Sequence, residues 1–354
     1  MTALLTLTVL ALVAIAIWQM TKIFELSQLR TEQATAEIAT DSDNKYNGYL
    51  LFGFLFFIYG ITIFSFAKYS KVLLPEASSA HGGEYDQLMW VSFAIIFFVQ
   101  TITQALLHYF GYKYKGEKGK KALFFADNDR LEFIWTIIPV IVLAGLILWG
   151  LYTWTNIMDV NEEDDPLIVE LYAQQFNWTA RYGGDDNVLG DASVRLIDID
   201  KANVLGLDES DPNASDDVIV KELHLPVGRK VNFSMRSQDV LHSAYMPHFR
   251  AQMNCVPGMI TQFSFTPTIT TEEMRLNPEV VDKVKRTNTI RAKWAAEGRP
   301  DSDPWEFDYV LLCNKICGKS HYNMQMKIIV ETEEEFNEWL AEQSTFQETI
   351  SLNP

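Results

Sequence analysis

The N-terminal half of the chain is dominated by four long apolar runs. They cover about residues 3–20, 48–68, 88–110 and 133–155, and each is near the ~20 residues that a helix needs to cross a bilayer. This pattern predicts a helical transmembrane domain over residues 1–157 with four spans. The first run has no basic residue before Lys22 and no clear small-residue cleavage site, so we expect a retained span rather than a signal peptide.

The basic residues between these runs predict how the spans are oriented. The connection 111–132 contains five lysines and Arg130, which marks it as cytoplasmic. The loop 69–87 has only one basic residue, Lys71, and is expected to face outward. The mixed loop 21–47 is then assigned to the inside by elimination. Both termini, and with them the C-terminal part of the chain, are expected in the periplasm or an equivalent space.

After the last run, the pattern changes to short alternating segments separated by turns. Seven short strands without interleaved helices predict an antiparallel sandwich or barrel. Residues 183–217 form an Asp-, Gly- and Asn-rich excursion that fits no EF-hand spacing and is expected to be a solvated loop. Residues 271–297 have helical spacing, and residues 333–343 are expected to form a short acidic helix. The candidate strands are Leu167–Tyr172, Val194–Ile199, Val218–Leu223, Lys230–Met235, Ile260–Phe265, Asp308–Cys313 and Gln325–Val330.

The charge of the chain is concentrated in its C-terminal part. Residues 1–155 contain 12 acidic and 11 basic residues, whereas the rest contains 34 and 18, a net charge of −16. Such a domain repels nucleic acid and anionic lipid and steers basic partners toward itself. We therefore expect no nucleic-acid partner, although a generic solvated surface also explains the charge.

The candidate chemistry lies in one twelve-residue segment, from Cys313 to Met324. Its two thiols, imidazole and thioether have the spacing C-x3-C-x3-H-x2-M, and a second imidazole, His242, lies upstream. Copper prefers sulfur ligands with one or two imidazoles, whereas structural zinc seldom uses a thioether. A disulfide between Cys313 and Cys317 and a zinc site remain alternatives. Cys255 has no obvious companion and is interpreted as a small buried apolar residue.

Three segments resemble a known family over most of residues 130–332. They are the metal loop, the stretch from Asp239-Val240-Leu241-His242 to Val256-Pro257-Gly258, and Glu132-Phe133-Ile134-Trp135-Thr136-Ile137-Ile138-Pro139. Together they resemble subunit II of the haem–copper cytochrome c oxidases. The resemblance implies a cupredoxin-like Greek-key sandwich over residues 158–332, with insertions at 183–217 and 268–306 and a C-terminal helix and tail at 333–354. The extra spans and the second insertion suggest a bacterial version, which would place the chain in the inner (cytoplasmic) membrane.

The resemblance also implies a binuclear copper centre of the CuA type. Cys313 and Cys317 would bridge two copper ions, His242 and His321 would each bind one, and weaker ligands would be Met324 and the backbone carbonyl of Lys315. Bridging thiolates spread one unpaired electron over both metals, and a rigid sandwich keeps the reorganisation small. The centre is therefore expected to relay electrons rather than to bind a substrate.

Further positions in this sequence depart from the family pattern or carry a role implied by it. The family usually has Glu where this chain has Lys315, so we expect no shared magnesium ion held by this side chain. Phe176 stands where the family commonly has a Trp, at the surface where the electron arrives. Trp178 is an alternative residue for passing the electron to the centre, or it is simply a core aromatic residue. Glu132, at the mouth of the last span, would admit protons toward subunit I.

The function implied by the resemblance is that of the electron-accepting subunit of a terminal oxidase. A c-type cytochrome would reduce the copper pair, and the electron would pass to haem in subunit I for the reduction of oxygen to water with proton translocation. The chain has no C-x-x-C-H and is expected to carry no haem. The donor would be a separate cytochrome or a haem domain of an associated quinol-oxidising complex.

Three other classes of protein share part of this pattern. A thioredoxin-like copper chaperone also uses C-x3-C and a distant His, but Met324, the strand-only texture and the four spans argue against it. A quinol oxidase subunit II would lack the metal ligands, all of which are present here. Nitrous oxide reductase has a similar loop but is a soluble enzyme with a large second domain, for which this chain has no counterpart.

Overall fold

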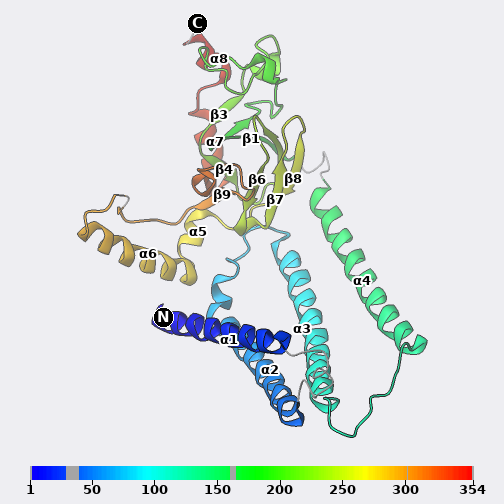
Figure 1. Cartoon of the computed structure of the whole chain (residues 1–354). Helices are drawn as coiled ribbons and strands as arrows, with labels where there is room; N and C mark the ends of the chain where they lie inside the picture. The colour runs from blue at the N-terminus through cyan, green and yellow to red at the C-terminus, as the bar shows by residue number, and fades with distance from the viewer. Residues whose placement is uncertain (1, 29–39, 160–164, 301, 353–354) are drawn as a thin grey trace. The chain divides into compact units, whose positions relative to one another are not determined.

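Four apolar helices precede a β-sandwich in the computed structural model, which describes residues 2–28, 40–159, 165–300 and 302–352 (Figure 1). By length and composition, each of the four is able to cross a membrane. The predicted fold class, transmembrane-type helices followed by an all-β sandwich, is confirmed. The helices are α1 Thr2–Gln28, α2 Asp41–Tyr69, α3 Gly82–Lys113 and α4 Asp129–Met158.

The chain divides into two compact units. The first comprises residues 1–67 and 96–128, and the second comprises residues 68–95 and 129–354. In the first unit, the Tyr112 ring packs so closely on Gly48 that a Cβ there would lie 2.8 Å from Tyr112 Cδ2. Asn44 Nδ2 also donates to Gly116 O at 3.0 Å. A glycine on α2 thus allows the close approach of α3 within this unit.

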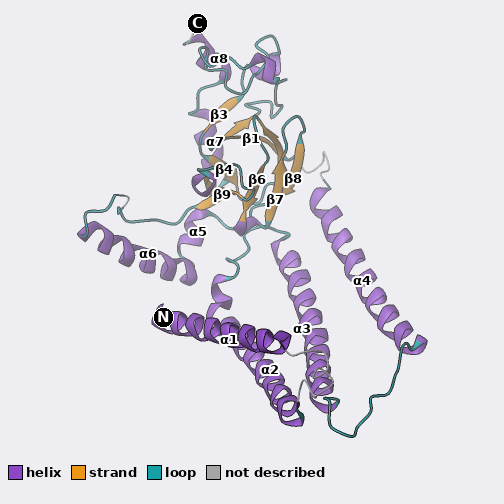
Figure 2. Ribbon diagram, viewed as in Figure 1, coloured by secondary structure: helices purple, strands orange, loops and turns teal. Residues whose placement is uncertain are grey.

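The β domain consists of two five-stranded sheets (Figure 2). One has the strand order β3-β2-β1-β5-β8, and the other has the order β4-β10-β9-β6-β7. Apolar side chains from both sheets, such as Phe233 and Ile328, share one fully buried core. The strands are β1 Leu167–Gln174, β2 Asn177–Tyr182, β3 Val218–Val220, β4 Leu223–Pro226, β5 Val231–Ser237, β6 His242–Met246, β7 Ala251–Cys255, β8 Thr261–Phe265, β9 Tyr309–Cys313 and β10 Gln325–Glu331.

The sheets are mixed, which corrects the expectation of a purely antiparallel sandwich. β1 pairs with β5 in parallel, and β10 pairs with β4 in parallel. Parallel neighbours need long connections, and the excursion after β2 and the chain between β4 and β10 supply them. A count of short apolar runs cannot reveal which strands become neighbours through such connections.

One further expectation about local structure was wrong, and another holds with a break in the helix. Val194–Ile199 is not a strand: residues Val194–Leu196 form a 3₁₀ turn, and Ser193 Oγ accepts from Arg195 N at its start. Val194 and Ile199 are exposed, so their alternation does not reflect a buried face. The predicted helix 271–297 is two helices, α5 Thr271–Arg275 and α6 Pro278–Ala296, because Asn277 and Pro278 start a new helix.

The C-terminal helices pack on the β domain. They are α7 Glu333–Ala341 and α8 Phe346–Ser351, each beginning with a Thr–Glu capping box. On α7, Trp339 stacks on His224 with ring centroids 3.8 Å apart. The same Trp contacts Tyr182 edge to face at 5.6 Å. The end of the chain therefore closes the sandwich at the β2 and β4 strands.

The loop after α2 is attached to the β domain. Ser78 N donates to His248 O at 2.7 Å, and Ala80 N donates to Thr266 O at 3.0 Å. Arg250, whose side chain is nearly buried, forms an ion pair with Asp86 in the first turns of α3 at 2.7 Å. The segment that the charge pattern assigned to the outside thus lies on the same side as the β domain.

The excursion 183–217 is more ordered than the solvated loop that its composition predicted. Leu205, Leu207 and Ala214 form a small second core with Tyr172 and Phe346. An ion-pair network beneath it ties the excursion to the first sheet. The excursion therefore covers the outer face of this sheet instead of projecting into solvent.

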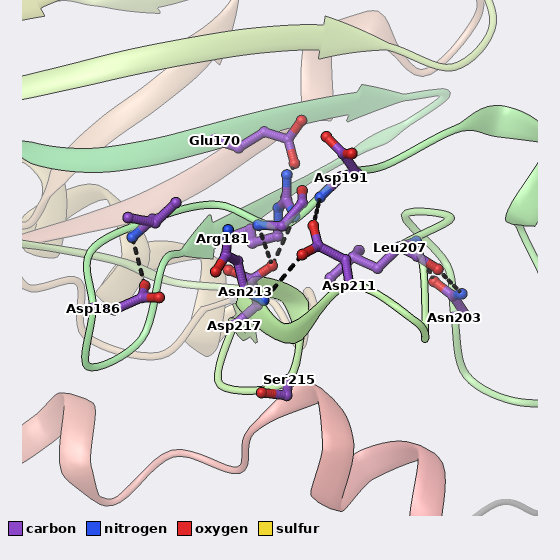
Figure 3. A network of polar contacts seen from close by, with 12 residues as sticks. Glu170, Arg181, Asp186, Asp191, Asn203, Leu207, Asp211, Asn213, Ser215 and Asp217 are labelled. Atoms are coloured by element: carbon purple, nitrogen blue, oxygen red, sulfur yellow. Dashed lines mark hydrogen bonds and ion pairs between the residues drawn. The ribbon is translucent and has the colours of Figure 1, made fainter.

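Arg181 on β2 is the centre of that network (Figure 3). Its guanidinium donates to Glu170 at 2.7 Å, to Asp217 at 2.8 Å and to Gly190 O at 2.8 Å. The side chains of Arg181, Glu170 and Asp217 are 4%, 4% and 0% exposed, and Arg236 also binds Glu170. A buried carboxylate such as Asp217 destabilises the fold unless a cation is paired with it.

Replacing Arg181 by Met should lower the free energy of unfolding by about 3 kcal/mol, because it leaves Asp217 buried without its cation. Denaturant unfolding of the full chain in detergent, followed by tryptophan fluorescence, measures this loss. Arg195→Met, at an exposed position of the same excursion, is the matched control and should change stability little. Equal losses in the two variants would contradict the role of the network.

Candidate metal centre

The pairing of β6 with β9 brings the distant histidine to the metal loop. Ala244 on β6 lies opposite Cys313 on β9, so the two strands place His242 and Cys313 at one end of the second sheet. The His242 Nδ1 atom lies 3.7 Å from Cys313 Sγ. Residues 71 positions apart in the chain thereby become neighbours.

The remaining candidate ligands lie in the loop between β9 and β10. Cys317 Sγ lies 3.8 Å from Cys313 Sγ and 3.7 Å from His321 Nδ1. Met324 Sδ lies 3.8 Å from Cys317 Sγ, and the carbonyl oxygen of Lys315 lies 3.2 Å from Cys313 Sγ. Each thiol therefore has one imidazole and one weaker donor beside it.

These distances exclude a disulfide and fit the spacing of metal ligands. The two sulfur atoms of a disulfide are about 2.05 Å apart, whereas Cys313 and Cys317 are free thiols separated by 3.8 Å. Two sulfur ligands of a tetrahedral ion lie about 3.8 Å apart when each metal–sulfur bond is about 2.3 Å long. The donor set therefore fits a bound metal, and His242, Cys313 and Cys317 already place their ligand atoms within 4.8 Å of one another.

The chemistry of the donors favours copper over zinc. A structural zinc ion takes four ligands, whereas two thiols, two imidazoles, a thioether and a carbonyl converge here. Thioether and thiolate sulfur are the ligands that copper prefers. The set is large enough for two ions that share the thiols.

A carboxylate behind His242 fixes the orientation of its ring. Asp239 Oδ1 lies 2.8 Å from His242 Nε2, which leaves Nδ1 directed at the thiols. Burial raises the pKa of Asp239, but hydrogen bonds from His242 and from the N–H groups of Gln175 and Val240 outweigh it, so that the pKa is lowered. The carboxylate therefore stays ionised and positions the imidazole.

Gln175, which follows β1, connects this carboxylate to the metal loop. Its backbone N donates to Asp239 Oδ2 at 2.8 Å, and its side-chain Nε2 donates to Cys317 O at 2.5 Å. A residue in the turn between β1 and β2 is thus bonded both to the segment before His242 and to the metal loop. Gln175 could not be singled out from the sequence, since an exposed amide gives no recognisable signal by itself.

The thiols lie in a largely dry environment. Cys313 is 8% exposed, Cys317 5%, Met324 1% and His242 0%. Burial, together with the neighbouring Cys313, raises the pKa of Cys317 to about 11. Metal binding at neutral pH must therefore displace a thiol proton. Cys255, paired with His242 across β6 and β7, is fully buried as expected, and burial raises the pKa of its thiol to about 12.

The structure separates the two aromatic residues that were considered for electron arrival. Phe176 is half-buried over the metal loop, where a Cβ on Gly318 would lie 2.8 Å from Phe176 Cζ. Gly318 also has a φ of +143°, which favours glycine. Trp178 is 2% exposed and meets the His242 ring edge to face at 6.2 Å. Phe176 therefore packs on the metal loop at a partly exposed position, whereas Trp178 is buried beside the His242 ring.

Glu132 and His248 lie apart from the cluster. Glu132 is exposed in the first turn of α4, and its role stays a prediction. His248 is not one of the metal donors. It follows the far end of β6 from His242 and is buried between Phe307 and Tyr309, where burial lowers its pKa to about 4.

Comparison with known proteins gives the family. Models of the transmembrane domain and the periplasmic domain of cytochrome c oxidase subunit II match residues 67–153 and 167–273. The alternative cytochrome c oxidase subunit 2 of Bradyrhizobium diazoefficiens is 33% identical over 266 residues, covering 75% of this chain and 82% of the relative. This chain belongs to the cytochrome c oxidase subunit II family. The predicted family is confirmed, and the chain is a subunit of a haem–copper oxidase with a periplasmic domain and other oxidase subunits as partners.

More distant members of the family match a similar length. Cytochrome c oxidase subunit 2 of Thermostichus vulcanus is 21% identical over 303 residues, covering 79% of this chain and 81% of the relative. That of Cereibacter sphaeroides is 22% identical over 276 residues, covering 72% of this chain and 76% of the relative. The periplasmic model includes His242 but ends at residue 273, before α6 and the metal loop. The donor set of that loop is therefore argued from its own geometry.

Replacing Asp239 by Asn should weaken copper binding by about 10- to 100-fold, because the carboxylate no longer fixes the His242 ring. Competition between the full chain and a copper chelator measures the affinity. Asp208→Asn, an exposed carboxylate of the excursion with only local hydrogen bonds to Ser210, is the control and should leave the affinity unchanged. If the two variants bound copper equally well, the positioning role of Asp239 would be wrong.

Proposed function

We propose that this chain is the electron-accepting subunit of its oxidase and binds two copper ions in a CuA-type centre. The observation that carries the proposal is the convergence of four further donors on two thiols 3.8 Å apart. Cys313 and Cys317 would be shared by both ions, with His242, His321, Met324 and the carbonyl of Lys315 completing the set. A copper pair bound there would supply a one-electron carrier between a donor and haem in subunit I, where oxygen is reduced to water with proton translocation.

The residues around the centre suit such a relay. Asp239 and Gln175 hold the ligand-bearing segments from the first sheet, and the ligands themselves belong to strand ends and a short loop. The ligands therefore need to move little when the charge of the centre changes, which keeps the reorganisation energy of electron transfer small. Burial of the thiols excludes water from the side that faces the core.

We infer that the donor is a c-type cytochrome that docks near Phe176. Ile316 and Tyr322 are exposed within the metal loop, and Phe176 packs on it. Apolar contacts of this kind on an acidic domain suit a basic, transient partner. Trp178 can provide electronic coupling to the buried side of the centre through its contact with the His242 ring. A haem domain of an associated quinol-oxidising complex is the second candidate donor, and the inner (cytoplasmic) membrane is the location that we propose for the chain.

The Lys315 side chain bears on whether a magnesium ion can be shared with subunit I. Its carbonyl oxygen is directed at Cys313 Sγ, while its side chain is exposed. An ammonium group offers no lone pair to a magnesium ion, which takes oxygen ligands. We therefore propose that this side chain holds no shared magnesium.

Copper loading of the full chain in detergent tests the centre. We expect two copper ions per chain and an EPR hyperfine pattern from one electron shared by two nuclei. The loaded centre should be reduced by a basic c-type cytochrome at a rate that falls with ionic strength. Cys317→Ser should abolish the shared pattern, whereas Cys255→Ala, at a buried thiol outside the cluster, should retain it. One copper ion per wild-type chain, or the spectrum of an isolated cupric ion, would refute the binuclear centre.

Glu132 is proposed to admit protons toward subunit I from the first turn of α4. Replacing Glu132 by Gln removes the titrating group and should slow turnover of the assembled oxidase severalfold while its copper content stays the same. Glu117→Gln, in the loop before α4, is the control and should not affect turnover. Oxygen consumption and metal analysis of the same preparations check this, and unchanged turnover in Glu132→Gln would remove the assignment.

A further inference from the structure

Four exposed apolar side chains gather in one short loop of the excursion that follows β2. Within this loop, residues 194–204, Val194 is 61% exposed, Leu196 42%, Ile199 78% and Val204 37%. Single exposed apolar residues are ordinary on a protein surface, whereas a group of them marks an interaction site. None of the four belongs to either buried core of the β domain, so packing within the chain does not explain them.

The loop 194–204 is folded on itself and held in one shape. Asp198 and Asn203 exchange backbone hydrogen bonds of 3.0 and 2.8 Å. The buried Asn203 side chain donates to Leu196 O at 3.2 Å. It also donates to Leu207 O at 2.9 Å and accepts from Leu207 N at 2.8 Å (Figure 3). An ordered loop therefore presents the apolar side chains, which lowers the entropy lost when a partner binds.

The charge around the loop determines which partner suits it. The excursion 183–217 contains ten acidic and two basic residues. Of the acidic ones, only Asp217 is buried, and Arg181 is paired with it, so nine carboxylates outnumber two cations at the surface. Their field repels a second copy of this chain, anionic lipid and nucleic acid, and it attracts a basic protein.

The excess carboxylates lie at the base of the loop, while the charges of the loop itself balance. The loop contains two aspartates, one arginine and one lysine, and Lys201 pairs with Glu209 at 3.6 Å. At its base, Asp208 N donates to Asp191 O at 2.9 Å, and Asp191 N donates to Asp211 Oδ2 at 2.7 Å. The surface thus has an apolar centre and an acidic rim, an arrangement typical of protein–protein contacts.

The second core places the loop over the part of β1 that is nearest the metal centre. Leu205, which directly follows the loop, belongs to that core together with Tyr172 of β1. Phe176 comes four residues after Tyr172, at most about 14 Å along the chain. A c-type cytochrome of about 100 residues has a radius of gyration of about 13 Å and is roughly 30 Å across. A donor whose haem edge is at Phe176 is therefore large enough to contact the loop as well.

We propose that the loop 194–204 is a docking surface for the basic c-type donor and retains it while its haem edge faces Phe176. This inference rests on the function proposed above. Apolar side chains of the donor would cover Val194 and Ile199, and its lysines would approach the carboxylates at the base of the loop. Affinity for the donor would then depend on the loop, whereas electron transfer would depend on Phe176 and the metal centre.

Binding of a basic soluble c-type cytochrome to the copper-loaded full chain in detergent tests this surface. Surface plasmon resonance measures the Kd and the association rate. Val194→Ser/Ile199→Ser removes the two most exposed apolar side chains and should raise the Kd about ten-fold, because less apolar area is buried on docking. The matched control, Val281→Ser/Ile290→Ser, makes the same changes at exposed positions of α6 and should bind like the wild type. Unchanged copper content shows that each variant is folded.

A second pair of variants tests the charge. Asp198→Asn/Asp200→Asn should slow association about three-fold at low ionic strength and have little effect at high ionic strength, because rim charges act on the association rate. Asn keeps an oxygen for the backbone N–H groups of Asp200 and Lys201, which Asp198 Oδ1 accepts. Glu338→Gln/Glu342→Gln removes two exposed carboxylates at α7 and should leave the association rate nearly unchanged.

The rate of copper reduction at saturating donor separates this inference from the proposed function. We expect the loop variants to be reduced at the wild-type rate once the donor is bound. If the wild type and both loop variants bind the donor equally, the loop is not a docking surface, although reduction of the wild type would still support the electron-accepting role. If the donor binds but does not reduce the copper-loaded wild type, the proposed function itself fails. Loss of a neighbouring subunit from the purified Val194→Ser/Ile199→Ser oxidase, with donor binding intact, would also overturn the inference, because the loop would then bind that subunit.

Discussion

The pairing of β6 with β9 is the contact on which the candidate metal centre depends. It places an imidazole from one strand and a thiol from another 3.7 Å apart, although 70 residues of chain, including α5 and α6, lie between them. Each strand is buried in the common core, and a shift of one residue would turn its side chains to the other face. The packing of apolar residues elsewhere in the sandwich therefore determines which donors meet at its end.

A second constraint acts from the opposite sheet. Asp239 orients the His242 ring, and Gln175 binds both Asp239 and the carbonyl of Cys317. The ligands are thus held by hydrogen bonds to backbone and carboxylate groups that take no part in metal binding. Such outer contacts fix the geometry of a site whether or not it is loaded, which is the general condition for a centre that changes charge without changing shape.

The sequence was sufficient for the parts of the molecule that follow from length and spacing. Four apolar runs of spanning length predicted four helices, and C-x3-C-x3-H-x2-M predicted a sulfur-rich site. β6 was missed because His242–Met246 has an almost continuously buried pattern instead of an alternating one, and β7 was missed because it contains no β-branched or aromatic residue. Val194–Ile199 alternates but is exposed. Gln175 and the parallel strand pairs depend on contacts between distant segments, which no local pattern reveals.

The attachment of Ser78–Ala80 to the β domain has a mechanical consequence. A domain joined to the membrane by α4 alone could rotate about a single flexible connection. Here the loop between α2 and α3 is also bonded to the residue after β8 and to the turn after β6, with Arg250 holding Asp86. A second attachment restricts that rotation more than one does. The orienting entropy that it removes is lost once, during folding, and does not have to be lost again when a partner docks.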